Sequence, residues 1–256
     1  MQAILLSAGK GERLKPYTNN WPKCLMPINK IPLLEYWIYD LVRLGVEKII
    51  INTHYLHEEL NYFIINNKYT KLIEVSYEEN LLGTGGTLKS LSDKLTDEEI
   101  IIIHSDNFCN CNLDEFLLAH RNRPPETNLT MMTFDTDEPE NCGIVKLNKL
   151  NIVEEFYEKS NLNKGNLANA AIYISSKSFI DTIKKLDNIQ DLSNDVINKN
   201  IGKIFTWKNE KNLIDIGNIE NLRKAQAIDH QLNISQQKEE WKVYYKETII
   251  YKLFYE

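Results

Sequence analysis

The stretch LLSAGKGERLKPYT, residues 5–18, joins a short apolar run to a glycine turn near the start of the chain. Residues 2–7 are rich in leucine and isoleucine and predict a first β-strand covered on both faces. Gly9 and Gly11 follow it, and the backbone N–H groups of such a turn can bind phosphate. Leu14 stands where the dinucleotide fingerprint G-x-G-x-x-G needs its third glycine, and the Walker pattern G-x-x-x-x-G-K-[ST] is absent. The turn alone therefore predicts a ligand-binding junction without identifying the ligand.

Two cations accompany this turn: Arg13 lies within it, and Lys23 follows directly after Pro22. A triphosphate carries several negative charges, which two fixed cations beside a glycine turn can neutralise. A nicotinamide needs no such pair. The pattern therefore favours a nucleoside triphosphate, and it argues against an NAD-dependent oxidoreductase, which also lacks its third glycine here.

Short apolar runs alternate with amphipathic segments through the first half of the chain, and this rhythm predicts a Rossmann-like α/β fold. Continuous apolar runs are typical of covered parallel strands, and apolar pairs at three- and four-residue steps are typical of helices. We expect a mixed, mainly parallel sheet flanked by helices, with right-handed crossovers. The expected strands are 2–7, 48–53, 72–77 and 100–104, and the expected helices are 33–42, 56–65 and 113–120.

The rhythm changes after residue 129, where four short β patterns follow one another and predict an antiparallel or mixed section. Helices are expected at 178–186 and 219–228. Because no Pro/Gly/Ser-rich linker or internal repeat interrupts the chain, residues 1–229 are expected to form one domain. The aromatic tail 230–256 is expected to pack on that domain or on a partner subunit, as in a homodimer. The four β patterns are 129–134, 143–147, 152–156 and 168–174.

The charge balance narrows the class of partner, because 30 basic and 36 acidic residues leave a net charge of −6. A nucleic-acid partner needs a basic footprint, which is missing. No apolar run approaches the roughly 20 residues that span a bilayer, and the N-terminus has no signal-peptide core. Four cysteines are too few for a disulfide scaffold, and the spacing Cys109-x-Cys111 is not a zinc pattern. We therefore expect a cytoplasmic protein with reduced thiols and with neither a nucleic-acid nor a membrane partner.

Short motifs follow one another in order from the glycine turn to residue 217. The first is G-x-G-x-R-L-x-P-x-T followed by P-K-x-x-x-P, which runs from Gly9 to Pro27. The others are LGTGGT at 82–87, HSDN at 104–107, CGIV at 142–145, EK at 158–159, NAAIY at 169–173 and DIG at 215–217.

In this order the motifs resemble those of the sugar-1-phosphate nucleotidyltransferases, which make a nucleotide sugar and pyrophosphate from a nucleoside triphosphate and a sugar 1-phosphate. The resemblance implies a fold of the nucleotide-diphospho-sugar transferase type, here without a β-helix extension. The motifs look most like those of guanylyltransferases that act on mannose- or heptose-type 1-phosphates for bacterial surface polysaccharides, such as capsule or lipopolysaccharide. GTP is therefore the favoured nucleotide.

The resemblance also assigns residues to a reaction in which the sugar phosphate attacks the α-phosphorus. It implies Arg13 at the β- and γ-phosphates, Lys23 at the α-phosphate and Lys159 at the sugar phosphate. Mg²⁺ prefers one or two carboxylates with phosphate oxygens and water, and Asp106 with Asp215 would hold it. The implied catalytic residues are Arg13, Lys23, Asp106 and Asp215; the nucleotide-binding residues are Leu6, Ala8, Gly9, Gly11, Glu79, Gly83 and Thr84; the sugar-phosphate-binding residues are Gly143, Glu158, Lys159 and Asn169.

Two other functions stay open. A cytidylyl- or uridylyltransferase could act on another sugar phosphate, or on a small non-sugar phosphate such as phosphocholine or glycerol phosphate. A non-catalytic regulator could bind a nucleotide sugar without turning it over. Loss of Asp106, Asp215 or Lys23 would have favoured the regulator, and all three are present.

The chain departs from the family pattern at three positions. Ser105 replaces the usual glycine before Asp106, which we expect to be harmless, and Ser160 stands where proline is common. Ala171 replaces the common glycine of N-A-G-x-Y and is expected to narrow the sugar pocket. Because the two facing carboxylates of Asp106 and Asp215 should repel, replacing Asp106 by asparagine is expected to leave the melting temperature unchanged or higher.

Overall fold

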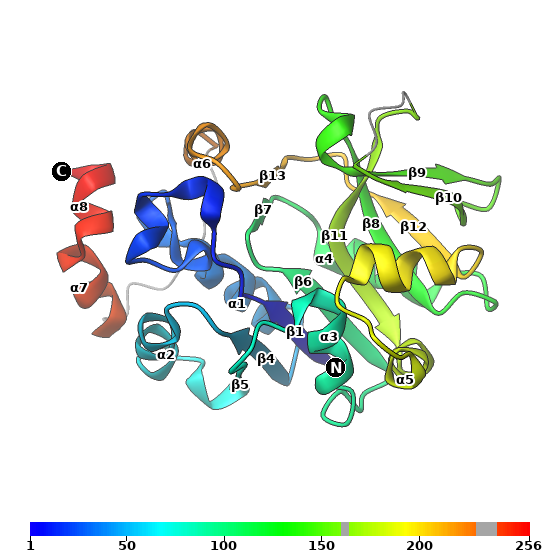
Figure 1. Ribbon diagram of the computed structural model, residues 1–256, viewed down its shortest axis with the longest axis horizontal. Helices are drawn as coiled ribbons and strands as arrows, with labels where there is room; N and C mark the ends of the chain where they lie inside the picture. Colours follow the sequence, from blue (N-terminus) through cyan, green and yellow to red (C-terminus); the bar gives the residue numbers. More distant parts are fainter. Residues whose placement is uncertain (160–163, 229–239) are drawn as a thin grey trace. The chain divides into compact units, whose positions relative to one another are not determined.

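The computed structural model describes residues 1–159, 164–228 and 240–256 (Figure 1). The predicted domain boundary at 229/230 and the position of Ser160 lie outside the described residues. The chain divides into two compact units, which we call the terminal unit and the central unit. The terminal unit comprises Ala3–Leu81, His104–Asn110 and Ile214–Glu256, and the central unit comprises Met1–Gln2, Leu82–Ile103 and Cys111–Leu213.

The terminal unit is built on three neighbouring strands in the order β1-β4-β5. They are β1 (Gln2–Leu6), β4 (Lys48–Thr53) and β5 (Ile73–Tyr77), and β4 and β5 run parallel. The connecting helices are α1 (Leu33–Arg43) and α2 (His57–Ile65). The apolar runs predicted as strands 2–7, 48–53 and 72–77 and the helices at 33–42 and 56–65 are confirmed.

Short elements shape the chain around these strands. Between β1 and α1 lie the 3-10 turns η1 (Glu12–Leu14), η2 (Tyr17–Asn19) and η3 (Lys23–Leu25), followed by the two-residue strands β2 (Pro27–Ile28) and β3 (Ile31–Pro32). Two further short strands, β7 (Asn107–Cys109) and β13 (Leu213–Asp215), pair with each other. Helix α6 (Ile219–Gln226) follows β13 and confirms the helix predicted at 219–228.

The C-terminal helices pack within the terminal unit. They are α7 (Glu240–Glu247) and α8 (Ile249–Tyr255), drawn in red in Figure 1. The Trp241 ring lies 5.2 Å from the ring of Phe63, and the Tyr245 hydroxyl donates to the Leu25 carbonyl at 3.1 Å. Trp241 and Tyr245 are 2% and 3% exposed, so these aromatic side chains are part of the core of the unit.

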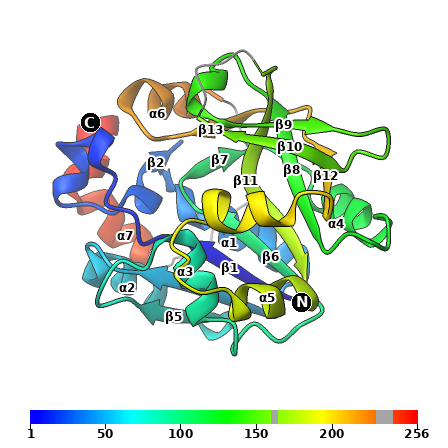
Figure 2. The same ribbon diagram turned by 45° about the vertical axis from the view of Figure 1, so that its right-hand side comes forward.

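The central unit has a sheet centred on β11, which pairs antiparallel with three strands and is seen clearly in Figure 2. Strand β12 runs parallel to β8, and β10 runs antiparallel to β9, so this sheet is mixed. The section predicted to follow residue 129 is confirmed. The strands are β6 (Glu99–His104), β8 (Leu129–Asp135), β9 (Gly143–Leu147), β10 (Val153–Glu158), β11 (Leu167–Ser176) and β12 (Ile204–Lys208).

The helices of the central unit include one that the sequence did not predict, α3 (Gly83–Ser90). Its first residues, GTGG, have low helix propensity, and tertiary hydrogen bonds described below compensate for this. The helices predicted at 113–120 and 178–186 are present as α4 (Leu113–Arg121) and α5 (Lys177–Lys185). The Rossmann-like α/β class is therefore confirmed. In the ranges that the structure describes, no helix is long and apolar enough to span a membrane.

Candidate active site

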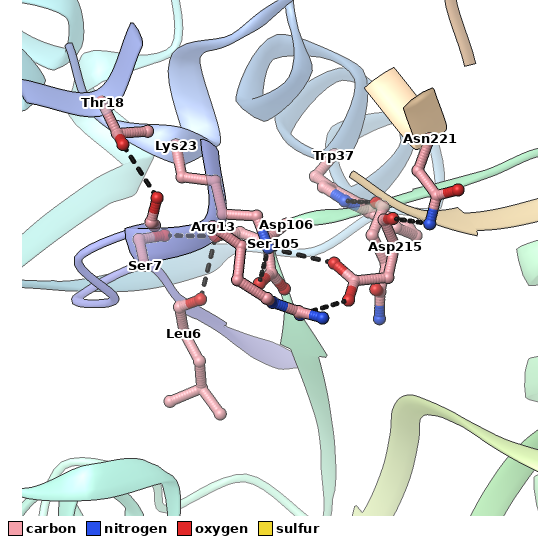
Figure 3. A network of polar contacts seen from close by, with 12 residues as sticks. Leu6, Ser7, Arg13, Thr18, Lys23, Trp37, Ser105, Asp106, Asp215 and Asn221 are labelled. Atoms are coloured by element: carbon pink, nitrogen blue, oxygen red, sulfur yellow. Dashed lines mark hydrogen bonds and ion pairs between the residues drawn. The ribbon is translucent and has the colours of Figure 1, made fainter. Parts of the chain in front are cut away.

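Lys23 lies between two aspartates in the terminal unit (Figure 3). Its Nζ is 2.6 Å from Oδ2 of Asp106 and 3.0 Å from Oδ1 of Asp215. The Lys23 side chain is 10% exposed, whereas those of Asp106 and Asp215 are 37% and 46% exposed. A nearly buried cation thus meets two carboxylates that solvent and ligands can still reach.

Local structure brings these three residues together from distant parts of the sequence. Lys23 begins η3, Asp106 lies in the turn after β6, and Asp215 ends β13. The N–H of Ile216 donates to the backbone carbonyl of Asp106 at 3.2 Å, and the side-chain amide of Asn221 donates to that of Asp215 at 3.0 Å. These hydrogen bonds restrain the backbone at both aspartates, next to Lys23.

Arg13 reaches the same cluster from η1. Its Nη2 is 3.3 Å from Oδ2 of Asp215, and its side chain is 68% exposed. Gly217 makes this approach possible, since a Cβ there would lie 2.6 Å from Nη2 of Arg13 and 2.9 Å from Oδ2 of Asp215. This arrangement therefore requires glycine at position 217 of the DIG motif, because any side chain there would collide with Arg13 and Asp215.

The charges of the cluster stabilise one another. Burial acts to lower the pKa of Lys23, but the charges of Asp106 and Asp215 outweigh it, so the pKa lies above its usual value. Burial acts to raise the pKa of Asp106, whereas Lys23 and His104 lower it more. The expectation that repulsion between the two carboxylates dominates is therefore wrong, because Lys23 lies between them and its positive charge attracts both.

The cluster offers a donor set that Mg²⁺ accepts. One oxygen of Asp106 and one of Asp215 approach the same cationic atom, so both face a common point. Within residues 1–159, 164–228 and 240–256, no group of three or more histidine, cysteine, aspartate or glutamate side chains is placed to hold a metal. Mg²⁺ typically takes one or two carboxylates and completes its shell with phosphate oxygens and water. The two aspartates fit that pattern in number and kind.

The glycine turn after β1 has a fixed backbone. Gly11 has φ +62°, and a Cβ there would lie 2.8 Å from Cγ2 of Thr18. The Thr18 hydroxyl and the N–H of Leu14 both donate to the Gly11 carbonyl, at 2.8 and 2.9 Å. At Gly9 an added Cβ would meet nothing within 4 Å. The left-handed backbone at position 11 and the nearby Thr18 side chain thus require glycine there, whereas a side chain at position 9 would project into open space.

The remaining residues predicted to bind the nucleotide in the terminal unit differ in exposure. Leu6 and Ala8 are buried, and Gly9 and Glu79 are exposed. The Leu6 carbonyl accepts hydrogen bonds from the N–H and the hydroxyl of Ser105, at 3.2 and 2.9 Å. The serine that replaces the family glycine therefore ties the end of β1 to the segment that carries Asp106.

Sequence reasoning missed two buried polar residues that support this turn, Asn52 and Glu78. The N–H of Ser7 donates to Oδ1 of Asn52 at 2.7 Å, and Nδ2 of Asn52 donates to Oε1 of Glu78 at 2.8 Å. The signal available in the sequence was a polar residue near the end of one apolar run and an acid directly after the next.

Gly83 and Thr84, predicted to contact the base, begin α3 in the central unit. The N–H groups of Gly85 and Gly86 donate to the Gln190 carbonyl at 2.7 and 3.2 Å, and the Thr84 hydroxyl accepts the N–H of Leu192 at 2.8 Å. Gly83 has φ +76°, and a Cβ there would lie 2.5 Å from that same carbonyl. A segment far along the chain thus completes the N-terminus of this helix.

The central unit places three of the predicted sugar-phosphate residues side by side. Gly143 in β9 is opposite Glu158 in β10, and a Cβ at Gly143 would lie 2.8 Å from Oε2 of Glu158. Nζ of Lys159 is 3.8 Å from Oε1 of Glu158, and the Lys159 N–H donates to the Cys142 carbonyl at 3.1 Å. Burial raises the pKa of Glu158 in spite of this lysine. The acid and the base therefore lie together at the end of the hairpin.

Asn169 is held by its own strand. Its Nδ2 donates to the Tyr173 hydroxyl at 2.7 Å, and its Oδ1 accepts the N–H of Ala171 at 2.9 Å. Ala171 has φ +55°, in the left-handed region that favours glycine. The alanine therefore adds backbone strain at a position where the family motif commonly has glycine.

Comparison with known proteins identifies a family and several relatives. A family model described as Nucleotidyl transferase matches residues 2–231. A heptose enzyme of Aneurinibacillus thermoaerophilus, D-glycero-alpha-D-manno-heptose 1-phosphate guanylyltransferase, is 29% identical over 228 residues, which are 88% of this chain and 97% of that protein. Mannose-1-phosphate guanylyltransferase 1 of Arabidopsis thaliana is 33% identical over 190 residues, which are 72% of this chain and 52% of that protein.

A solved structure has the same fold. It is HddC from Yersinia pseudotuberculosis complexed with GMP-PN, with a TM-score of 0.72 and 22% identity, covering 88% of this chain and 97% of that one. The chain thus spans nearly all of the bacterial relatives and about half of the plant relative.

Proposed function

The chain belongs to the nucleotidyl transferase family, and we propose that it transfers a guanylyl group from GTP to a sugar 1-phosphate and releases pyrophosphate. The observation that carries this proposal is the position of Lys23 between Asp106 and Asp215. It supplies a cation and two acidic metal ligands, which are what a reaction between two polyanions requires. The names of the relatives at 29% and 33% identity support guanylyl transfer to a mannose- or heptose-type 1-phosphate.

The proposed reaction needs no protein nucleophile. A phosphate oxygen of the sugar 1-phosphate attacks the α-phosphorus of GTP and forms a new P–O bond. The bond from the α-phosphorus to the bridging oxygen breaks, and pyrophosphate leaves with that electron pair. In this scheme Lys23 neutralises the α-phosphate, and the exposed Arg13 neutralises the β- and γ-phosphates. The work of the protein is therefore positioning and charge neutralisation.

Asp106 and Asp215 are proposed to hold Mg²⁺ together with the triphosphate. When bound, this ion supplies further neutralisation of the phosphate charge. In the central unit, Lys159 is proposed to bind the phosphate of the sugar because its side chain is 68% exposed and cationic. Glu158 is proposed to accept hydrogen bonds from sugar hydroxyls, and Asn169 is proposed to donate a hydrogen bond to one. Four free cysteines and a nucleoside triphosphate substrate favour the cytoplasm as the site of the reaction.

The direct test is a substrate matrix. The purified protein is incubated with Mg²⁺, each of GTP, UTP, CTP and dTTP, and each of mannose 1-phosphate, a heptose 1-phosphate, glucose 1-phosphate and phosphocholine. Pyrophosphate is measured, and the nucleotide sugar is identified by mass spectrometry. We expect turnover with GTP and a mannose- or heptose-type 1-phosphate, and its loss in the matched variant Asp106→Asn.

Other results would replace or correct this proposal. Turnover only with CTP and phosphocholine would replace the proposal by a cytidylyltransferase acting on a non-sugar phosphate. Thermal stabilisation by a nucleotide sugar without pyrophosphate from any pair would replace it by a binding regulator. Turnover with a different nucleotide and a sugar 1-phosphate would correct the base and keep the reaction type.

A further inference from the structure

Buried polar groups connect the ends of three neighbouring strands in the terminal unit. Ser7 directly follows β1, Asn52 lies near the end of β4, and Glu78 directly follows β5. The N–H of Ser7 donates to Asn52, which donates to Glu78, at 2.7 and 2.8 Å. Asn52 and Glu78 are 3% and 5% exposed, so little water competes for these bonds. We call Ser7, Asn52 and Glu78 the strand-end relay.

The relay continues toward the acidic cluster. Oγ of Ser7 lies 2.7 Å from Oγ of Ser105, which is 1% exposed and also bonds to the Leu6 carbonyl. Figure 3 shows Ser7 and Ser105 together, with Asp106 as the next residue. The relay therefore contacts both the start of the glycine turn and Ser105, which directly precedes Asp106.

The chemistry of the relay fixes its direction. A carboxylate only accepts hydrogen bonds, so Glu78 receives the N–H of the Asn52 amide, and the amide oxygen then faces the N–H of Ser7. Turned over, the amide would place its NH₂ against that N–H, donor against donor. The Glu78 backbone is itself held, because its N–H donates to the Thr53 carbonyl at 2.8 Å and its carbonyl lies 2.9 Å from Nδ1 of His54. A fixed carboxylate thus selects one orientation of Asn52.

We propose that Asn52 and Glu78 are positioning residues for nucleotide binding. They hold the backbone where it leaves β1 and so set the position of the N–H groups of residues 8–11. The inference rests on the proposed function, in which that turn faces the triphosphate, and it adds two residues that no motif of the family resemblance contained. A buried carboxylate is costly unless hydrogen bonds compensate it, and one such bond comes from Asn52, which also accepts the N–H of Ser7 at the start of the glycine turn.

An exchange of donor and acceptor tests this proposal. Asn52→Asp places two carboxylates against each other and should raise the dissociation constant for Mg-GTP about tenfold, the size expected for one lost hydrogen bond at a fixed site. Glu78→Gln added to Asn52→Asp restores the pattern, because the new amide can donate to the new carboxylate, which still accepts the N–H of Ser7. The double variant should return to within about threefold of the wild type.

The matched control is the second buried asparagine–glutamate pair of the same unit, where Nδ2 of Asn67 donates to Oε2 of Glu35 at 2.6 Å. Both side chains are at most 2% exposed. Asn67→Asp should lower the melting temperature as Asn52→Asp does, but leave the dissociation constant for Mg-GTP within about twofold. A structural role for Asn52 predicts no such difference between the two variants.

Binding is measured by titration calorimetry, and amide exchange of a peptide covering residues 5–9 is measured without ligand. We expect faster exchange of this peptide in Asn52→Asp and recovery in the double variant. Unchanged GTP affinity in folded Asn52→Asp, or failure of Glu78→Gln to rescue it, would overturn the inference. Failure of the wild type to bind any of GTP, UTP, CTP and dTTP would instead overturn the proposed function, whereas the exchange data would still report whether the relay holds the turn.

Discussion

Replacing Asp106 by asparagine should lower both the rate and the melting temperature, because the structure places Lys23 between two carboxylates. Nζ of Lys23 is 2.6 Å from Oδ2 of Asp106 and 3.0 Å from Oδ1 of Asp215. The variant keeps the shape of the side chain and removes one of two charges that compensate a lysine only 10% exposed. The folded state therefore loses an ion pair.

The size of the loss follows from the burial of the partners. Breaking a fully buried pair costs roughly 3–5 kcal/mol, and breaking an exposed one roughly 0–1 kcal/mol. Asp106 is 37% exposed and Asp215 remains with Lys23, so we expect about 1–2 kcal/mol of unfolding free energy. For 256 residues, an unfolding entropy of about 2.1 cal/mol/K per residue converts this to a fall of about 2–4 °C.

Two measurements check this prediction. Calorimetry without nucleotide gives the melting temperature, and pyrophosphate release gives the rate, which should fall roughly 10²–10³-fold through lost charge stabilisation. Asp181→Asn is the matched control, because it removes an ion pair with Lys177 at 2.7 Å whose carboxylate is 51% exposed. That variant should change the melting temperature by less than about 1 °C and leave the rate unchanged.

An unchanged or higher melting temperature in Asp106→Asn would refute the reasoning, since it would mean that repulsion between the carboxylates exceeds their attraction to Lys23. Near-normal turnover of this variant at limiting Mg²⁺ would show that Asp106 does not hold the metal ion. The double variant with Asp215→Asn should be little slower than the slower single variant, because ligands of one ion act as a unit.

Burial lowers the pKa of His120 from 6.5 to about 3. Below pH 6.5 the unfolded chain gains a proton that the folded chain does not, so the free energy of unfolding should fall by about 2 kcal/mol from pH 7 to pH 5. Denaturant titrations of His120→Gln should show a smaller change of the unfolding free energy over the same pH range. Ala171→Gly should raise the melting temperature by about 1–2 °C by removing strain at φ +55°, while Ala168→Gly in the same strand should lower it. Gly11→Ala should weaken Mg-GTP binding and stability, because its φ is +62° and its Cβ would collide with a neighbour, whereas Gly9→Ala, in open space, should leave calorimetric stability within about 0.5 kcal/mol. An equal loss of stability in the two glycine variants would contradict the backbone argument.

Local patterns in the sequence determined the elements and most of the candidate site. The isoleucine run 49–51 is fully buried in β4, because a strand covered on both faces needs apolar side chains at every position. The glycine turn, Lys23 and the two aspartates were found because their chemistry is tied to short motifs. What those motifs could not give was the pairing of Lys23 with both aspartates, which reversed the expected sign of the Asp106→Asn effect on stability.

Tertiary structure decided what depends on contacts across long separations. Helix α3 begins at a glycine-rich stretch with low helix propensity, and it forms where the Gln190 carbonyl, about a hundred residues later in the chain, accepts two of its N–H groups. Asn52 and Glu78 belong to no motif, and only the neighbouring order of β1, β4 and β5 brings Asn52 to Ser7 and Glu78 to Asn52. A sequence states which groups can donate, accept or carry charge, but a hydrogen bond needs its two atoms within about 3 Å, and folding alone sets that distance.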